Sequence, residues 1–419
     1  MYGFQDSAAN GGLPLQTRLR NYCDGNMDIV NLAFLSTFHD STGYPVINFA
    51  NQCDPTVSPN SVFPGTNLNH CPDIGSDITY CQSQGKIVLL SLGGWTSSTS
   101  APDANAFADQ LWNLFMEGTS SIRPFDNAII DGIDWDIEAS PGVDIVAVSQ
   151  RLKSHWAGSS RKYYMSAAPF CSGLKTQPYN AALLGNVSMD FIWPQFYSDW
   201  CSNAYWQNAP SPTGYYMNFN DWTTWAQGGG NPNPNVKLMV GALGGVDAGN
   251  PNDFLSEPNF AAEISSMQTN YPSHFGGAMF WDASWCYDAS PNYAGNAKSA
   301  MAAKATCSSS GGGKTTTTTT TTTSSKSTTA TSSTSTNPTT TTTTTSTPPT
   351  TTTSTSATPT STGLPACNYA NNGQSICSAP NSSAAYNQCV NGSWLTRACG
   401  PGTVCLQTTS STIQCGYAS

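Results

Sequence analysis

The segment DGIDWDIEAS, residues 131–140, contains four acidic residues, and three of them occupy every second position. These three are Asp134, Asp136 and Glu138, and apolar residues alternate with them. Alternation is the period of a β-strand, so we expect the three carboxylates on one face of a strand. Crowded carboxyls raise one another's pKa, which suits a group that must donate a proton near neutral pH. The pattern predicts acid catalysis, with a divalent-cation site as the alternative for a D-x-D sequence.

Elements that could position this strand lie on both sides of it. Apolar runs rich in strand-forming residues occur at 28–38, 86–94, 127–138, 162–170, 189–197, 236–243 and 274–282. Segments 101–120 and 143–156 have the spacing of amphipathic helices. This alternation predicts an α/β fold with a parallel sheet, and seven strands are one short of an eight-stranded barrel. In such a barrel, catalytic residues follow the strands, where Glu138, Tyr197 and Asp282 fall.

Charge and composition narrow the class of ligand. The 419 residues carry a formal net charge of −10 with only 15 Lys and Arg, and we find no basic run, which argues against nucleic-acid binding. Only 10% of the residues are charged, a composition that suits a neutral, hydroxyl-rich ligand. No apolar stretch approaches the roughly 18 residues of a membrane span.

The 14 cysteines indicate the compartment in which the chain folds. No CxxC pair occurs and there are only 4 His, so we expect no metal site. Disulfides require an oxidising compartment, and we therefore expect a secreted protein. The opening MYGFQDSAAN has neither the charged nor the apolar region of a leader, so either a leader has been removed or the recorded start is wrong.

Changes of composition divide the chain into three parts. Residues 1–307 form the predicted α/β domain. Residues 308–363 are almost entirely Thr and Ser with scattered Pro, a disordered and O-glycosylated type of linker. Residues 364–419 contain six Cys and few large apolar residues, so this small domain should depend on disulfides. Six cysteines allow 15 pairings, and the sequence does not choose among them.

Five motifs in the first domain carry a family resemblance. They are SLGGW (91–95), DGIDWDIE (131–138), MSAAPFC (165–171), WPQFY (193–197) and GGAMFWD (276–282). Together they resemble glycoside hydrolase family 18, and within it the class III chitinases of plants and fungi. The resemblance implies a (β/α)8 TIM barrel that acts on chitin and chitin oligosaccharides without a cofactor or a metal. Most of the first strand of that barrel would lie upstream of Met1, so we expect this strand to be truncated.

The resemblance also implies roles for four catalytic residues. Glu138 would protonate the leaving oxygen and later deprotonate water, while the substrate's own acetamide oxygen attacks the anomeric carbon. Asp136 would polarise the acetamide N–H, Asp134 would share a proton with Asp136, and Tyr197 would donate its hydroxyl to the acetamide carbonyl. Configuration would be retained. Strand spacing alone leaves this open, because positions i and i+2 lie about 6.5–7 Å apart, near the boundary between retaining and inverting geometries.

Further positions follow from the same resemblance. Gln195 would hydrogen-bond the sugar, and Trp281 would form the apolar floor beneath it. Ser198 stands where the family usually has Asn. The implied disulfides are Cys23–Cys81, Cys53–Cys71 and Cys171–Cys201, which leaves Cys286 and Cys307 as a fourth pair.

The last domain resembles a second family. NNGQSIC, QCVNGSW and CGPGTVC are similar to a small fungal chitin-binding module, carbohydrate-binding family 19. That resemblance implies sugar stacking by Trp394, whereas the alternative makes Trp394 part of this domain's core. The whole chain is interpreted as a secreted, monomeric, endo-acting chitinase with a tethered chitin-binding module. The alternatives are an endo-β-N-acetylglucosaminidase that cleaves N-glycans and a non-catalytic chitin-binding lectin.

Overall fold

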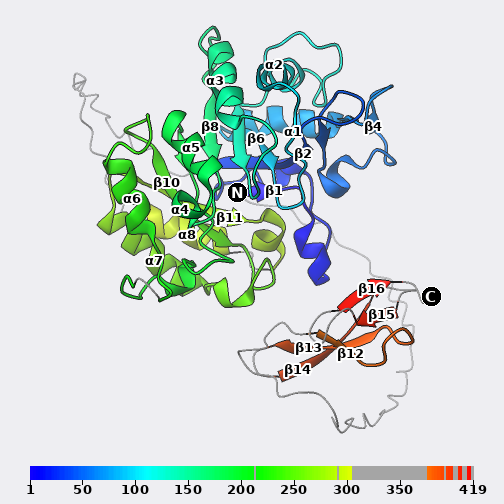
Figure 1. The fold of residues 1–419 in the computed structure, drawn as a ribbon, viewed down its shortest axis with the longest axis vertical. Helices are drawn as coiled ribbons and strands as arrows, with labels where there is room; N and C mark the ends of the chain where they lie inside the picture. The colour runs from blue at the N-terminus through cyan, green and yellow to red at the C-terminus, as the bar shows by residue number, and fades with distance from the viewer. Residues whose placement is uncertain are drawn as a thin grey trace, which may run out of the picture. The chain divides into compact units, whose positions relative to one another are not determined.

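The computed structural model describes residues 1–211, 214–289, 292–303, 375–390, 393–399, 404–407 and 413–416. The chain divides into two compact units, Met1–Thr315 and Thr316–Ser419, and each is described by itself (Figure 1). The linker predicted for residues 308–363 lies outside the described residues, so its boundaries stay a prediction.

A curved sheet of parallel strands forms the centre of the first unit. In its described residues the strand order is β1-β2-β6-β7-β8-β9-β10-β11, and β1 lies in contact with β11. The bounds are β1 Tyr2–Gly3, β2 Ile29–Thr37, β6 Ile87–Gly93, β7 Gly132–Asp136, β8 Tyr164–Ala167, β9 Phe191–Ile192, β10 Lys237–Leu243 and β11 Phe275–Trp281. The sheet therefore curls into a nearly closed barrel, as the alternation of strands and helices predicted.

Helices surround this sheet (Figure 1). Their bounds are α1 Pro72–Ser83, α2 Ala104–Phe115, α3 Ile145–Trp156, α4 Gly173–Thr176, α5 Pro178–Asn186, α6 Phe219–Gln227, α7 Glu257–Asn270 and α8 Tyr293–Ala302. Helix α3 begins after Asp144, whose carboxylate accepts hydrogen bonds from the free N–H groups of the first turn. Its buried face includes Val148 and Leu152. The apolar spacing that predicted α2 and α3 is thus the spacing that packs them on the sheet.

Short strands complete the unit. β3 Val46–Ile47 pairs antiparallel with β2, and β4 Ser61–Val62 pairs with β5 Asn69–His70. Each of the seven predicted apolar runs contains a strand, which confirms those predictions. The first strand, expected upstream of Met1, is represented by Tyr2–Gly3, which pairs with Asn31 and Leu32 of β2. We expected a truncated first strand; β1 has two residues, which suffice for the pairing and place Tyr2 inside the barrel.

Three disulfides link segments of the first unit within the residues that the structure describes. They are Cys23–Cys81, Cys53–Cys71 and Cys171–Cys201, the pairs that the family resemblance implies. The fourth expected pairing is not seen, because Cys286 is a buried free thiol. Its expected partner, Cys307, lies outside the described residues.

The described part of the second unit consists of strands, the turn at residues 378–384 and Cys399. β12 Ser375–Cys377, β13 Ala385–Val390 and β14 Ser393–Ala398 form an antiparallel sheet, and β15 Val404–Gln407 pairs with β16 Ile413–Gly416. A disulfide joins Cys377 to Cys405, and Cys399 is buried beside them. Tyr386 packs against this cluster, while Trp394 lies half-buried on β14 opposite Cys389.

Among the helices that the structure describes, none combines the length and the apolar character that crossing a membrane requires.

Candidate active site

The three carboxylates predicted to share one face lie at the C-terminal end of β7. Asp134 and Asp136 are on the strand, and Glu138 follows two residues later. The apolar residues between them pack outward, and the Trp135 indole donates to Ser149 Oγ of α3 at 3.0 Å. Helix α3 therefore fixes the outer face of the strand whose inner face presents the acids.

Two glycines bring the neighbouring strands close to this one. Gly132 begins β7 with φ of +144°, and a Cβ there would lie 1.9 Å from the Tyr164 carbonyl oxygen. Gly93 ends β6 with φ of +117°, and a Cβ there would lie 2.1 Å from the Asp136 carbonyl oxygen. Any side chain would push the strands apart at the level of the acids. Gly93 of SLGGW and Gly132 of DGIDWDIE are therefore needed for the close packing of neighbouring strands.

Asp134 is the most enclosed of the three carboxylates. Its Oδ2 accepts from the Tyr2 hydroxyl at 2.5 Å and from Ser91 Oγ at 2.7 Å. Its Oδ1 accepts from Ser166 Oγ at 2.7 Å and from Trp193 Nε1 at 3.0 Å. Burial raises the pKa of Asp134, and these hydrogen bonds oppose the rise. Because two oxygens offer about four acceptor positions, a proton on Asp134 would displace one of the donors.

Asp136 and Glu138 share one donor. Gln195 Nε2 lies 3.0 Å from Asp136 Oδ1 and 3.3 Å from Glu138 Oε1. Burial, together with the charges of Glu138 and Asp134, raises the pKa of Asp136 well above its usual range. Burial also raises the pKa of Glu138, against the Gln195 hydrogen bond. Each of these two carboxyls therefore retains its proton to higher pH than an isolated carboxyl would.

The acids open into a cleft of about 690 Å³ at the C-terminal ends of the strands. Asp136, Glu138, Gln195, Tyr197 and Trp281, all predicted as site residues, line it together. The structure thus brings the predicted barrel residues into one cleft. Asp134 lies behind them, buried in the barrel interior.

Aromatic rings form the floor and the rim of this cleft. Trp281 stacks on Phe34, with ring centroids 5.8 Å apart and an interplanar angle of 18°. Burial and the nearby carboxylates raise the pKa of Tyr197 well above its usual range, so its hydroxyl keeps its proton and can donate. Trp95 stands at the rim with 80% of its surface exposed. Such rings offer flat apolar faces of the kind on which sugars stack.

Several lining residues were not predicted from the sequence. Tyr2 and Trp95 have no predicted role, although Trp95 belongs to the SLGGW motif, and Phe34 lies within the apolar run 28–38. The one available signal was the placement of Trp95 directly after a glycine pair at a strand end. Asp282, which follows a strand and was considered among the residues at catalytic positions, is buried and accepts from Ser284 Oγ at 2.6 Å and from the Trp285 amide at 3.3 Å. These bonds make it a cap of the following turn.

The cation-binding alternative for the acidic strand does not suit this geometry. The oxygens of Asp134 already accept four hydrogen bonds from protein donors, which a metal ion would have to displace. In the described part of the chain, one group of side chains has ligand-like spacing, Cys171, Asp199 and Cys201. Its two sulfurs form a disulfide and offer no thiolate.

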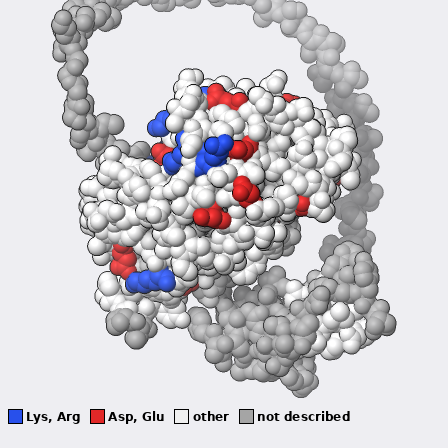
Figure 2. Space-filling view, turned by 45° about the horizontal axis from the view of Figure 1, so that its top comes forward, with Lys and Arg blue, Asp and Glu red and all other residues white. Residues whose placement is uncertain are grey.

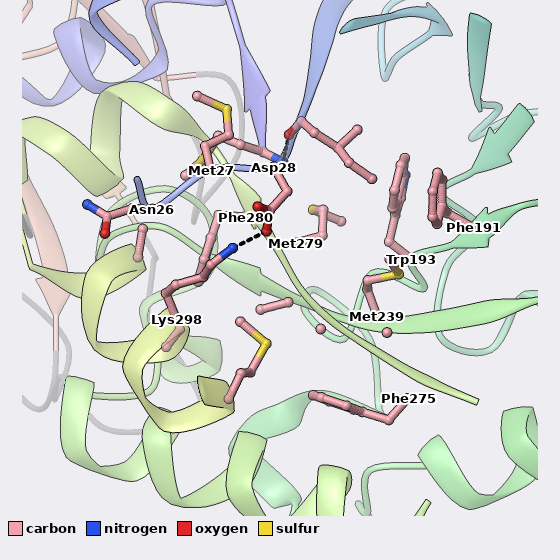
Figure 3. A pocket seen from close by; sticks show the side chains of 18 of the residues that line it. Asn26, Met27, Asp28, Phe191, Trp193, Met239, Phe275, Met279, Phe280 and Lys298 are labelled. Atoms are coloured by element: carbon pink, nitrogen blue, oxygen red, sulfur yellow. Dashed lines mark hydrogen bonds and ion pairs between the residues drawn. The ribbon is translucent and has the colours of Figure 1, made fainter. Parts of the chain in front are cut away.

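A second cavity, of about 570 Å³, lies where the strands begin (Figure 3). The side chains that line this cavity are largely apolar and include Trp193, Met239 and Met279. Lys298 forms an ion pair with Asp28 beside it. Asp136 and Glu138 lie at the C-terminal ends of the strands, away from this cavity, so the cavity is not the candidate active site.

The surface around the barrel is poor in charge. Figure 2 shows a face on which Lys, Arg, Asp and Glu side chains are few and scattered among uncharged residues. Such a surface offers no field that would attract a polyanion, and it suits a neutral polar ligand.

Comparison with protein families gives one match that covers more than half of the chain. The family described as glycosyl hydrolases family 18 matches residues 15–244. Chitinase 1 of Rhizopus niveus is 39% identical over 297 residues, which cover 68% of this chain and 54% of that protein. A class III chitinase of Arthroderma benhamiae is 36% identical over 312 residues, which cover 72% of this chain and 90% of that protein. The chain thus spans about half of the first relative and most of the second.

Among solved structures, the ICChI chitinase of Ipomoea carnea is similar to the first unit. The two share 27% sequence identity with a TM-score of 0.56, and the alignment covers 72% of this chain and 98% of that one.

Proposed function

Since the chain belongs to family 18 of the glycosyl hydrolases, we propose that it is a secreted endo-acting chitinase that cleaves internal β-1,4-N-acetylglucosamine linkages. The observation that carries this proposal is the Gln195-bridged pair of Asp136 and Glu138, which opens into a cleft floored by Trp281. A neutral, aromatic-lined cleft with a protonated carboxyl is what hydrolysis of an uncharged polysaccharide requires. The names of the relatives agree with this substrate.

In the proposed reaction the substrate supplies the nucleophile. Glu138 donates its proton to the glycosidic oxygen while the acetamide oxygen attacks the anomeric carbon, so the leaving sugar departs as an alcohol. Asp136 accepts a hydrogen bond from the acetamide N–H, and Tyr197 donates to the acetamide oxygen. Glu138, now ionised, takes a proton from water, and this water opens the bicyclic intermediate with retained configuration.

Asp134 supports this sequence without touching substrate. Four donors favour its ionised form, so the proton that it shares with Asp136 rests on Asp136. When the acetamide N–H binds, Asp136 can give up that proton toward Asp134 and become the stronger acceptor. The two carboxyls would thus adjust to the charge that develops on the acetamide.

The test compares the parent chain with Glu138→Gln on chitin tetramers and hexamers. We expect the variant to lose about a hundredfold or more of kcat and to retain substrate binding, because general acid catalysis contributes about 10²–10⁴-fold. Proton NMR of the first product should give the β anomer, as retention requires. Hydrolysis of N-glycans in preference to chitin oligomers would favour the endo-β-N-acetylglucosaminidase alternative. Chitin binding without hydrolysis by the parent would favour the lectin.

For the second unit we propose chitin binding that holds the enzyme on the insoluble polymer. The support is its disulfide-linked antiparallel sheet and the half-buried Trp394 on β14. Sedimentation of the full chain with insoluble chitin should show weaker binding for Trp394→Ala than for Ser382→Ala, an exposed control. Hydrolysis of soluble oligomers should be equal in both. A Trp394→Ala chain with a lowered melting temperature and unchanged chitin binding would instead make Trp394 a core residue.

We further propose that the protein acts outside the cell as a monomer. Its disulfides support an oxidising compartment, because such bonds rarely persist in the cytosol. Gel filtration of the purified chain tests the monomer.

A further inference from the structure

The loop that follows β9 is tied to the loop that follows β10 beside the cleft. The backbone N–H of Ser198 donates to Asp253 Oδ2, with 2.7 Å between the two atoms. Ser198 is the residue after Tyr197, and both line the cleft. Asp253 closes the short 3-10 helix η5, Pro251–Asp253, which shares its loop with the cleft-lining residues Ala248 and Gly249.

The backbone at Ser198 needs such a partner. The backbone angle φ of Ser198 is +57°, in the left-handed region that residues other than Gly, Asn and Asp seldom adopt. A residue of this kind persists only where its surroundings hold it in place. The Asp253 carboxylate accepts the hydrogen bond of the Ser198 N–H and so restrains the peptide from which this φ torsion starts.

The Asp253 carboxyl is buried and held by several hydrogen bonds. Only 3% of its surface is exposed. Burial raises the pKa of its carboxyl, and hydrogen bonds from Ser202, Ser198 and Asn250 lower it. A buried carboxylate that receives several donors is held in one rotamer, so it can act as a fixed point for the loop.

Other contacts hold the same loop on either side of Tyr197, whose ring packs against the barrel interior. The Asn203 amide donates to the Phe196 carbonyl at 2.8 Å, and the Cys171–Cys201 disulfide attaches the loop further along. Asp199 accepts a hydrogen bond from the Ser172 hydroxyl. These contacts act before and after the peptide that joins Tyr197 to Ser198, whereas Asp253 acts on that peptide itself.

We propose that Asp253 is a positioning residue that orients Tyr197 toward the substrate acetamide by holding the Tyr197–Ser198 peptide. This inference rests on the proposed role of Tyr197 as a donor in the cleft. Fixing the peptide plane fixes the torsion on the C-terminal side of Tyr197 and so the direction in which its ring enters the cleft. Asp253 also makes the orientation of Tyr197 depend on the loop that carries Ala248 and Gly249, at the edge of the cleft.

The test is a double-mutant cycle between Asp253→Ala and Tyr197→Phe, with chitin tetramer as substrate. If Asp253 acts through the Tyr197 hydroxyl, Asp253→Ala lowers kcat about ten- to hundredfold in the parent and has little effect in the Tyr197→Phe chain. KM should change much less than kcat, since the cleft floor is intact. Asp253→Asn, which keeps an oxygen in reach of the Ser198 amide, should recover most of kcat.

Two controls separate positioning from general stability. Asp247→Ala removes an exposed carboxylate from the same loop and should leave kcat unchanged. Melting temperatures are measured for each chain. Should Asp253→Ala fail to fold, Asp253→Ser replaces it in the cycle, because its hydroxyl stays polar but is too short to reach the amide.

The outcomes distinguish this inference from the proposed function. Equal losses of kcat from the Asp253 change in both backgrounds would overturn the positioning role while leaving Tyr197 catalytic. A Tyr197→Phe chain as active as the parent would overturn both the role of Tyr197 and the inference. If the parent cleaves no chitin oligomer, the proposed function fails, and a crystal structure of the Asp253 variant then decides whether the Tyr197 ring has moved. An unmoved ring would refute the inference.

Discussion

The hydroxyl of Tyr2 donates a hydrogen bond to Asp134, with 2.5 Å between the phenol oxygen and Oδ2. The two residues are 132 positions apart in the sequence and meet in the barrel interior. Trp193 Nε1 in turn lies 3.0 Å from the same phenol oxygen. The two-residue strand β1 thus contributes a donor to the most enclosed carboxylate.

Tyr2→Phe should lower kcat by about tenfold or more with little change in KM, because a hydrogen bond to a charged group is worth roughly 1.5–3 kcal/mol. Loss of this donor makes the ionised form of Asp134 less stable, so the shared proton moves from Asp136 toward Asp134 before substrate binds, and the transfer that substrate binding should trigger is lost. Steady-state kinetics on chitin tetramer measure the change. Tyr44→Phe, at a half-buried tyrosine outside the cleft, is the control, and equal kinetics of the two variants would contradict the prediction.

Gln195→Met should shift the alkaline limb of the pH–activity profile to higher pH. The Gln195 hydrogen bond lowers the pKa of Glu138, so its removal raises that pKa. A general acid works only while protonated, and activity is lost as pH rises through its pKa. The same variant should have a lower kcat, since Asp136 loses its donor. Profiles of kcat/KM from acid to alkaline pH check the shift, and a limb that moves to lower pH would refute it.

Trp95→Ala should weaken the binding of long substrates without affecting the fold. The indole is 80% exposed, so its removal leaves no cavity, whereas a stacked sugar loses its platform. We expect KM for chitin hexamer to rise about three- to tenfold, in line with the roughly 0.5–1.5 kcal/mol typical of aromatic stacking. Leu15→Ala, an exposed apolar residue outside the cleft, serves as the matched control. A rise in KM shared by both variants would point to a cause other than stacking.

Glu263→Gln should stabilise the protein at neutral pH. Burial raises the pKa of Glu263 well above its usual range, against a hydrogen bond from Asn203. Between the unfolded pKa of about 4.3 and that raised value, the folded state holds a proton that the unfolded state releases, so stability falls as pH rises. The variant should lose this dependence. Melting temperatures from pH 4 to 9 measure it, with Glu257→Gln, at the half-buried first residue of the same helix, as the control. Parallel curves for the parent and Glu263→Gln would contradict the assignment.

The sequence predicted those parts of the site that depend on local periodicity. Alternation in residues 131–138 is a property of the strand itself, so it predicts that Asp134 and Asp136 share one face, which the structure shows to be the inner one. The spacing of residues 143–156 likewise predicted α3, because one face of a helix must meet the sheet.

The contacts that complete the site join segments far apart in the sequence, so local alternation and helical spacing do not predict them. Nothing near Tyr2 indicates Asp134 as its partner, and nothing near Ser198 indicates Asp253. Glu263 illustrates a different limit. Its spacing from Phe260 and Met267 puts it on the buried face of α7, but its residue type suggests solvent. Tertiary packing overrides that preference.

The octet DGIDWDIE also reaches both ends of the barrel. At its start, Asp131 accepts hydrogen bonds from the Val88 amide at 2.9 Å and from Arg161 at 3.2 Å, while at its end Glu138 enters the cleft. Seven strand steps of about 3.3 Å separate these anchors by about 23 Å. Because Asp131 and Glu138 are both held in place, the number of residues between them is fixed. One inserted residue would turn Trp135 and Ile137 into the barrel and the carboxylates into the helix layer, so its length is as constrained as its composition.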